Sequence, residues 1–224
     1  AMTIAAVSTT PAQAKLSKKA KAAKKKGLVS TMTRNVYLGA DLGPAINSDG
    51  AADFISKNGQ ILRDVDINNM PVRAKGLAAD LVGLQELALW RTGAASLTPP
   101  ITGDYTASDV RVDNLAELMK QLNKGKKRYR VVKVQNEFDF EAPADLDNDP
   151  TTGAATLGGE INGRLTMRDA ILAKVGAGVK VKKTDSANFE TIYQPVISGI
   201  PVNVDRGWVS ADVKVRKSPM FRFV

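Results

Sequence analysis

The sequence predicts an α+β sandwich in which mostly antiparallel sheets are covered by a few helices. Short runs rich in β-branched residues recur along the 224 residues, and several of them alternate apolar with polar side chains. Clear helical spacing appears in one segment, where Leu115, Leu118, Met119 and Leu122 precede Gly125, a residue suited to end a helix. Strands therefore dominate the predicted fold.

The first part of the chain is read in order as strand, loop and an uncertain segment. Residues 28–36 (LVSTMTRNV) predict a strand, and residues 39–50 predict a loop. The pattern of residues 51–79 is ambiguous, apart from a short helix expected near residues 72–79. The apolar run at residues 81–85 (LVGLQ) then predicts a buried strand.

The second part of the chain is dominated by alternating strands. Loops are expected at residues 93–108 and at the acidic, Gly-rich residues 141–163, on either side of the predicted helix. The predicted strands are residues 129–134, 164–174, 179–183 and 202–215.

The N-terminal 26 residues differ from the rest. Ala12-Gln13-Ala14 follows small, weakly apolar residues, a pattern typical of a signal-peptidase site, although an Ala-rich tail gives the same letters. Residues 15–26 hold seven lysines and no acid, so most of the net charge of +9 belongs to a tail that is either solvated or in contact with polyanions. We therefore divide the chain into a signal-peptide remnant with a Lys-rich disordered tail at 1–26 and a folded region at 27–224, and expect a secreted protein.

Two absences limit the chemistry. The chain contains no Cys and no His, which excludes thiolate or imidazole metal ligands, cysteine nucleophiles and Ser–His–Asp triads within it. A bound metal must then be a hard ion on oxygen ligands, such as Mg²⁺, Mn²⁺ or Ca²⁺. No apolar run reaches the roughly 20 residues that span a bilayer, so no transmembrane segment is expected.

Two polar residues at predicted strand ends are candidates for a site. Glu86 directly follows the apolar run LVGLQ, and Asn35 ends the first β-rich run. A carboxylate in that position either faces water at the end of the sheet or is held by a partner such as a metal, because a buried unpaired carboxylate is too costly. Asn35 is either a turn residue or part of the same site.

The motifs around these residues resemble those of the endonuclease/exonuclease/phosphatase family of phosphoesterases. The segments T-R-N-V-Y (33–37) and L-V-G-L-Q-E (81–86) are similar to its first two signatures. The segments Y-R-V-V (129–132), R-D-A-I-L (168–172) and R-G-W-V-S-A-D-V (206–213) are similar to later strands of secreted bacterial members. The resemblance covers residues 28–224 and implies the N-terminal half of a four-layer αββα sandwich.

The resemblance also implies roles and partners. Glu86 would ligate a divalent metal, Mg²⁺ or else Mn²⁺ or Ca²⁺, and would be catalytic together with Asn35, which orients the phosphate or a metal-bound water. Arg168 would bind substrate, unless it is simply a solvated strand residue. The substrate would be a phosphoester, nucleic acid among the candidates.

The family's His residues and its Asp–Asn pair for the nucleophilic water are not found in this chain, so we expect it to be inactive alone. A complementary C-terminal half would supply them, and an apolar sheet face awaiting that half would favour partner binding or dimerisation. The alternative function is a non-catalytic secreted polyanion-binding module.

The acidic loop leaves a separate question open. Asp145, Asp147 and Asp149 alternate like the start of a calcium loop, but Pro150 and Thr156 stand where an EF-hand needs Gly and Glu. The loop is either a looser Ca²⁺ site or plain solvated loop.

Overall fold

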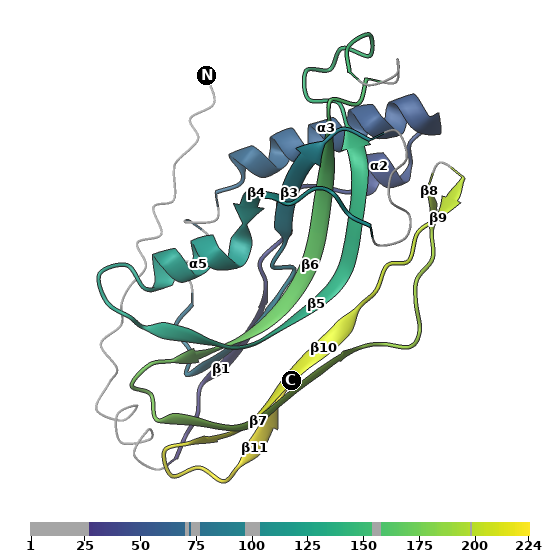
Figure 1. The fold of residues 1–224 in the computed structure, drawn as a ribbon. Helices are drawn as coiled ribbons and strands as arrows, with labels where there is room; N and C mark the ends of the chain where they lie inside the picture. The colour runs from purple at the N-terminus through teal and green to yellow at the C-terminus, as the bar shows by residue number, and fades with distance from the viewer. Residues whose placement is uncertain (1–26, 70–71, 73–76, 97–103, 154–157, 198) are drawn as a thin grey trace, which may run out of the picture.

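The computed structural model describes residues 27–69, 72, 77–96, 104–153, 158–197 and 199–224 and has a mixed α/β fold made mostly of strands (Figure 1). The larger sheet has the order β1-β2-β6-β3-β4, and β5 also pairs with β6. A smaller sheet has the order β11-β10-β7, and a hairpin joins β8 to β9. All these pairings are antiparallel except that of β1 with β2.

The bounds of the elements follow the chain. The larger sheet contains β1 (Thr31–Asn35), β2 (Leu81–Gln85), β3 (Leu89–Ala94), β4 (Asp109–Asp113), β5 (Tyr129–Ala144) and β6 (Ile161–Lys174). The smaller sheet and the hairpin contain β7 (Val179–Asn188), β8 (Val196–Ile197), β9 (Ile200–Pro201), β10 (Gly207–Val215) and β11 (Phe221–Phe223). The described helices are α2 (Gly43–Ile46), α3 (Gly50–Ile67) and α5 (Asn114–Leu122).

Strand β6 is the centre of the larger sheet. On one edge it pairs with β2 through residues 170–173 and with β3 through residues 161–166. On the other edge it pairs with β5 along almost its whole length. Residues 167–169 therefore lie opposite the connection between β2 and β3, where the backbone N–H of Leu87 donates to the carbonyl of Arg168.

Alternation along β6 divides its side chains between two faces. We call the two faces even and odd after the residue numbers of β6 that point to them. The even face carries Ala170 and Leu172, and these pack with Leu118 and Leu122 of α5. Helix α5 begins where the Asp113 carboxylate accepts hydrogen bonds from the N–H groups of Leu115 and Ala116, as an N-cap should.

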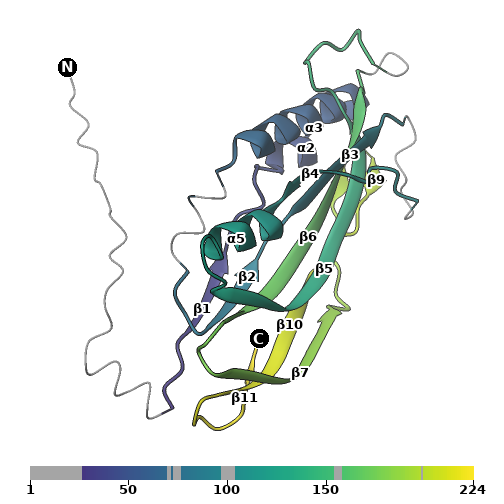
Figure 2. The same cartoon turned by 60° about the vertical axis from the view of Figure 1, so that its left-hand side comes forward.

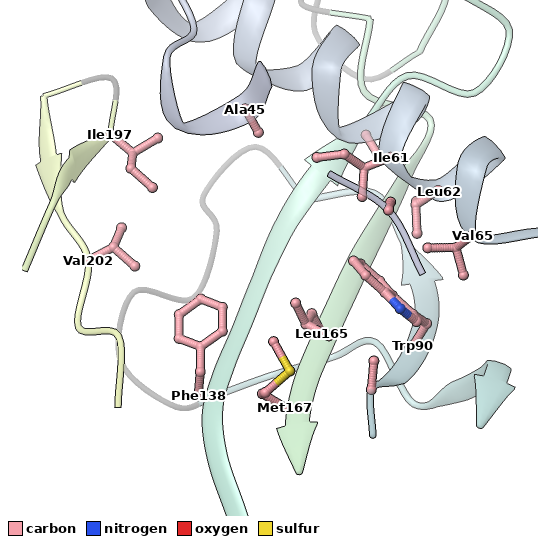
Figure 3. Packing of buried hydrophobic residues seen from close by; sticks show 13 residues of the cluster. Ala45, Ile61, Leu62, Val65, Trp90, Phe138, Leu165, Met167, Ile197 and Val202 are labelled. Carbon is pink, nitrogen blue, oxygen red and sulfur yellow. The ribbon is translucent and has the colours of Figure 1, made fainter. Parts of the chain in front are cut away.

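The odd face of β6 is covered by two different structures. Leu165 and Met167 pack against α3 and the segment around the β8–β9 hairpin (Figure 3). Ile171 and Ala173 pack against Val209, Ala211 and Val213 of the smaller sheet. That sheet and α5 thus lie on opposite sides of the larger sheet (Figure 2). Asp169 lies between the two covered regions of the odd face.

Several predicted elements are confirmed. The strand at 81–85 and the helix over 115–122 appear where the sequence places them, and β1, β6 and β7 fall on predicted strands. The coarse expectation of a strand-rich fold with mostly antiparallel sheets and few helices also holds.

Other boundaries were wrong. Residues 39–50 contain α2 and the start of α3, and the ambiguous segment begins with the 18-residue helix α3. The predicted loop 141–163 shrinks because β5 continues to Ala144 and β6 begins at Ile161. The predicted strand 202–215 begins at Gly207. Of the predicted helix at 72–79, residues 73–76 lie outside the described residues and residues 77–79 are not helical. The tail at 1–26 lies wholly outside the described residues.

We expected an apolar sheet face awaiting a complementary half, but the apolar face of the smaller sheet packs against the larger sheet. Its apolar side chains Val209, Ala211 and Val213 are buried against the larger sheet. Its outer face instead carries charged residues, among them exposed Lys214 and the ion pair of Arg222 with Asp212 at 2.7 Å. Among the described residues, no helix is both long and apolar enough to cross a membrane.

Candidate functional site

A cavity of about 260 Å³ lies at the irregular centre of the larger sheet. It is lined by polar and charged residues and one glycine, namely Asn35, Gln85, Glu86, Glu137, Asp169, Arg206 and Gly207. The lining thus joins the ends of β1 and β2, the middle of β5 and β6, and the start of β10.

The two residues predicted from strand ends meet in this cavity. Strands β1 and β2 are parallel neighbours in which Asn35 pairs with Gln85, the residue before Glu86. Asn35 and Glu86, each predicted to stand at a strand end, therefore lie at the ends of adjacent strands. Glu86 has a φ of 60°, an unusual left-handed conformation for a residue with a side chain, and it ends the pairing of β2. The Asn35 side-chain oxygen accepts a hydrogen bond from the N–H of Tyr37 at 2.7 Å.

A β-bulge brings a second glutamate to the cavity. The pairing of β5 with β6 shifts between Asn136 and Asp139, so Glu137 and Phe138 together oppose one residue of β6. Glu137 reaches the polar cavity, and Phe138 packs with Met167 in the neighbouring apolar cluster. The bulge therefore directs two consecutive side chains to the odd face, where regular alternation would separate them.

The third carboxylate, Asp169, holds the end of β2. Its Oδ1 atom accepts a hydrogen bond of 3.3 Å from the backbone N–H of Glu86. Glu137 is likewise held by the start of β10, because its Oε1 atom accepts a hydrogen bond of 3.1 Å from the N–H of Gly207. Two of the three carboxylates, Asp169 and Glu137, are thus held by backbone groups of other strands.

Arg206 is the only basic side chain among the described residues that line this cavity. Its Nη1 atom lies 3.6 Å from Oε2 of Glu137, and its Nη2 atom lies 4.0 Å from Oε1 of Glu86. These are long contacts for ion pairs, and nearly half of the arginine side chain is exposed. One guanidinium therefore only partly offsets three carboxylates.

The electrostatics of the cavity favour the uptake of positive charge. Burial and, next, the nearby Asp169 together raise the pKa of Glu137 to about 7, against the opposing effects of Arg206 and the Gly207 N–H. Burial also raises the pKa of Asp169, although the Glu86 N–H and Arg206 oppose it. Neighbouring carboxylates with raised pKa values gain by binding either a proton or a cation.

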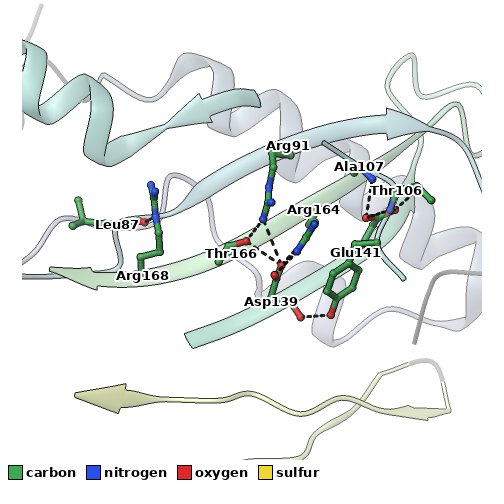
Figure 4. A network of polar contacts seen from close by, with 10 residues as sticks. Leu87, Arg91, Thr106, Ala107, Asp139, Glu141, Arg164, Thr166 and Arg168 are labelled. Carbon is green, nitrogen blue, oxygen red and sulfur yellow. Dashed lines mark hydrogen bonds and ion pairs between the residues drawn. The ribbon is translucent and has the colours of Figure 1, made fainter. Parts of the chain in front are cut away.

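Arg168 does not join this cavity. It lies on the even face of β6 and is almost fully buried (Figure 4). Its guanidinium donates to the carbonyl of Leu87 at 2.9 Å and to Asp113 Oδ1 at 2.5 Å. These contacts tie β6 to the β2–β3 connection and to the start of α5, so in this structure Arg168 supports the fold behind the cavity.

The same even face carries a second polar network farther along β6 (Figure 4). Asp139 accepts hydrogen bonds from Arg164 and Thr166, and Arg91 also bonds Thr166. Glu141 accepts hydrogen bonds from the N–H groups of Thr106 and Ala107 and thereby holds that segment against the sheet. The charged groups of this network are paired mainly with one another and with backbone N–H groups, so the network supports the fold.

The acidic loop contains the tightest carboxylate group among the described residues. Ligand atoms of Asp145, Asp147 and Glu160 all lie within 4.8 Å of one another, whereas Asp149 is outside this group. Backbone N–H groups already bond these carboxylates, such as that of Leu146 to Glu160 at 2.6 Å and that of Asn148 to Asp145 at 2.6 Å. These carboxylates therefore already have protein partners within the loop.

Sequence reasoning missed Glu137, Asp169 and Arg206 as site residues. A signal for Glu137 was present, because Glu137, Asp139 and Glu141 alternate with Phe138 and Phe140, a pattern typical of a strand. That pattern shows that β5 continues, but it does not show the bulge that turns Glu137 toward Asp169. Arg206 lies in a segment distant along the chain, and no local pattern links it to the other residues.

Comparisons with known proteins do not add a relative. A scan against models of known protein families finds no match to this chain, and searches of curated proteins and of solved structures find none either. The functional argument therefore rests on the residues and geometry of the cavity.

Proposed function

We propose that this chain is the N-terminal half of a secreted, divalent-metal-dependent phosphoester hydrolase. The observation that supports this proposal is the convergence of Asn35 and three carboxylates with one arginine in a single cavity. The finer fold that accompanies it is half of a four-layer αββα sandwich, of which the two packed sheets and the helix α5 would form part.

The donor atoms of the cavity fit a hard divalent cation. Glu86, Glu137 and Asp169 offer carboxylate oxygens and Asn35 an amide oxygen, the ligands that Mg²⁺, Mn²⁺ and Ca²⁺ prefer. In our proposal Glu86 holds the ion, with Asp169 beside it. The metal would act as a Lewis acid on a phosphoryl oxygen and stabilise charge on the leaving oxygen.

The remaining residues of the cavity would bind and orient the substrate. Arg206 can turn its exposed guanidinium from the long contacts with Glu86 and Glu137 to a phosphate, which a planar guanidinium binds through two hydrogen bonds. Asn35 would orient the phosphate from the neighbouring strand end. We therefore assign substrate binding to Arg206 and not to Arg168, whose guanidinium is occupied on the even face.

The chain would need further groups for turnover. It has no His, and the pair of residues that aligns the nucleophilic water in the resembled family is not recognised in it. Because catalytic residues act as a unit, the lack of some of them costs several powers of ten in rate. We accordingly propose that this chain binds the metal alone and hydrolyses phosphoesters only with a complementary C-terminal half.

Metal binding gives the first test. Titration of the chain with Mn²⁺, followed by electron paramagnetic resonance, should show a bound ion that Glu86→Gln weakens at least about tenfold, since one of the few charged ligands is lost. The matched control is Asp147→Asn, which alters the acidic loop and should leave this ion bound. Loss of the ion in Asp147→Asn but not in Glu86→Gln would place the metal in the loop and refute the assignment.

Hydrolysis gives the second test. Plasmid DNA, a simple phosphodiester and sphingomyelin are incubated with Mg²⁺ and the chain, with and without the complementary half added in trans. Activity that requires mixing and disappears in Glu86→Gln is the expected result. If the chain binds no metal and the mixture stays inert, the non-catalytic polyanion-binding module becomes the better reading.

A further inference from the structure

A second cavity of about 200 Å³ lies beside the carboxylate cavity. Its walls come from α2, α3, β5, β6 and the segment that carries the β8–β9 hairpin, which Figure 3 shows around a shared space. Ala45, Ile61, Phe138, Leu165, Ile197 and Val202 are among the buried lining residues. Tyr193, which is 68% exposed, and Ile46, which is 39% exposed, mark where the cavity meets solvent.

The chemistry of this second cavity suits an apolar group. Apart from Asn58 and Arg206, the described residues that line it are apolar or aromatic. The Asn58 amide is already engaged, since its Nδ2 atom donates to the carbonyl of Pro143 at 3.2 Å. Apolar cavities of about 150 Å³ stay dry and take up a molecule such as benzene. This somewhat larger space would hold one aromatic ring or a short alkyl chain.

Three features place the two cavities side by side. Met167 lines the apolar cavity and Asp169 the carboxylate cavity, and these residues are two positions apart on the odd face of β6, a distance of about 7 Å. The β5 bulge likewise supplies Phe138 to the apolar cavity and Glu137 to the carboxylate cavity. Arg206 lines both, so its guanidinium lies where an apolar group would join an anionic one.

We propose that the apolar cavity binds the organic group of the substrate, and that the substrate is an aryl or short-alkyl phosphoester. This inference rests on the proposed phosphoesterase function. The phosphate would lie against Arg206 at the carboxylate cavity while the ring or chain extends toward Met167, Phe138 and Leu165. Discrimination would then come from the fit of the apolar group, because the phosphate is common to all phosphoesters.

The test measures the binding of n-alkyl phosphates from ethyl to octyl by calorimetry in the presence of Mg²⁺. Each methylene that leaves water should tighten binding about fourfold until the cavity is filled, after which affinity should level off. The n-alkyl alcohols of the same lengths should bind more weakly, because they lack the anion that Arg206 recognises. Affinity that is independent of chain length would overturn the proposal, and alcohols that bind as tightly as phosphates would separate the cavity from the phosphate site and also overturn it.

Substitutions locate the effect. Val204→Trp adds a ring at a partly buried lining position and should remove the dependence on chain length while ethyl phosphate still binds. The matched control is Val110→Trp, made at a valine that is 62% exposed and outside the cavity, which should keep the dependence. An unchanged chain-length series in a folded Val204→Trp variant would refute the assignment.

A measurement on the unmodified chain covers the case in which Val204→Trp does not fold. With methyl-labelled methionine, hexyl phosphate should shift the signal of Met167, which lines the cavity. Met32 and Met119, which pack in the cluster under α5, should stay in place and act as internal controls. This readout requires neither metal binding nor turnover, so a shift without bound metal would refute the proposed function alone, and a bound metal without a shift would refute the cavity assignment alone.

Discussion

Glu137 connects the site to the stability of the fold. The pKa of this carboxyl group is about 7 in the folded chain, against an ordinary value of 4.5. Between these values the unfolded chain has released the proton that the folded chain still holds, so the free energy of unfolding falls as pH rises. The raised pKa of Asp169 acts in the same direction. Ionisation of these buried carboxylates thus lowers the free energy of unfolding at neutral pH, and a bound cation would offset this loss.

Replacement of Glu137 by Gln should remove most of this pH dependence. Below about pH 4.5 the two proteins should be similarly stable, because the glutamate is neutral in both its folded and its unfolded states. Above pH 7 the variant should be more stable by about 1–3 kcal/mol in the absence of divalent metal, since no charge is buried and the Gly207 N–H keeps an acceptor. Urea unfolding from pH 4 to 8 measures this difference.

The control for this substitution is Glu117→Gln on α5, at a glutamate that is 41% exposed. It should change stability by less than about 0.5 kcal/mol at every pH. A Glu137→Gln variant that is less stable than the parent at pH 8 would mean that the Glu137 carboxylate is stabilised by its contacts with Arg206 and Gly207, and that the raised pKa is wrong.

Single residues also show how far the sequence leads to the site. Asn35 and Glu86 could be found because each ends a run of strand-forming residues, and parallel pairing then brings such ends together. Glu137 could not be found in the same way, since its direction depends on a bulge that is set by the pairing of β5 with β6. Arg168 was chosen as a substrate-binding residue, but its neighbour Asp169, on the opposite face of the strand, is the residue that lines the cavity.

At the scale of elements, periodicity predicted strands better than helices. β2 and α5 each have an uninterrupted pattern, and both were found. Helix α3 was not, because Asn58 and Gly59 interrupt its apolar stripe of Ile55, Leu62 and Val65. Tertiary packing explains the interruption, since the glycine is required by a neighbouring strand end and the asparagine bonds a backbone carbonyl.

Gly59 gives a prediction whose sign is opposite to helix propensity. In an isolated helix Gly→Ala stabilises by about 1 kcal/mol. Here a Cβ atom at position 59 would lie 1.4 Å from the carbonyl oxygen of Asp145, so α3 and the end of β5 must separate. Gly59→Ala should also weaken the bond of 3.1 Å from the Asp145 N–H to the Ile55 carbonyl, and should destabilise by about 1–3 kcal/mol.

Chemical denaturation checks this prediction, with Gln60→Ala as the matched control. Gln60 is the next residue of α3 and is exposed, so its replacement should change the free energy of unfolding by no more than about 0.5 kcal/mol. A Gly59→Ala protein as stable as the parent would show that α3 does not pack closely on the β5 end.

The whole molecule is organised around the odd face of β6. Its two ends are covered by α3 and by the smaller sheet, and the carboxylate cavity lies where neither cover reaches. The chain beyond β7 must therefore return across the sheet to place Arg206 between the two covered regions. Such long-range closure has no local signal in the sequence, which is why the strand content could be predicted and the meeting of the two cavities could not.

The N-terminal tail gives a prediction for the whole chain that does not depend on the site. Residues 15–26 carry seven lysines, and without them the net charge of +9 falls to about +2. Each lysine that neutralises a charge on a polyanion releases a counterion, so affinity should fall steeply with salt. A block of lysines without acids has little apolar surface to bury, so we expect the fold not to need residues 15–26. Removal of residues 1–26 should therefore leave the melting temperature unchanged and shift elution from heparin to clearly lower salt.

Removal of residues 1–14 alone, which keeps all seven lysines, is the control and should elute like the full chain. If both truncations elute with the full chain, polyanion binding belongs to the folded region and not to the tail.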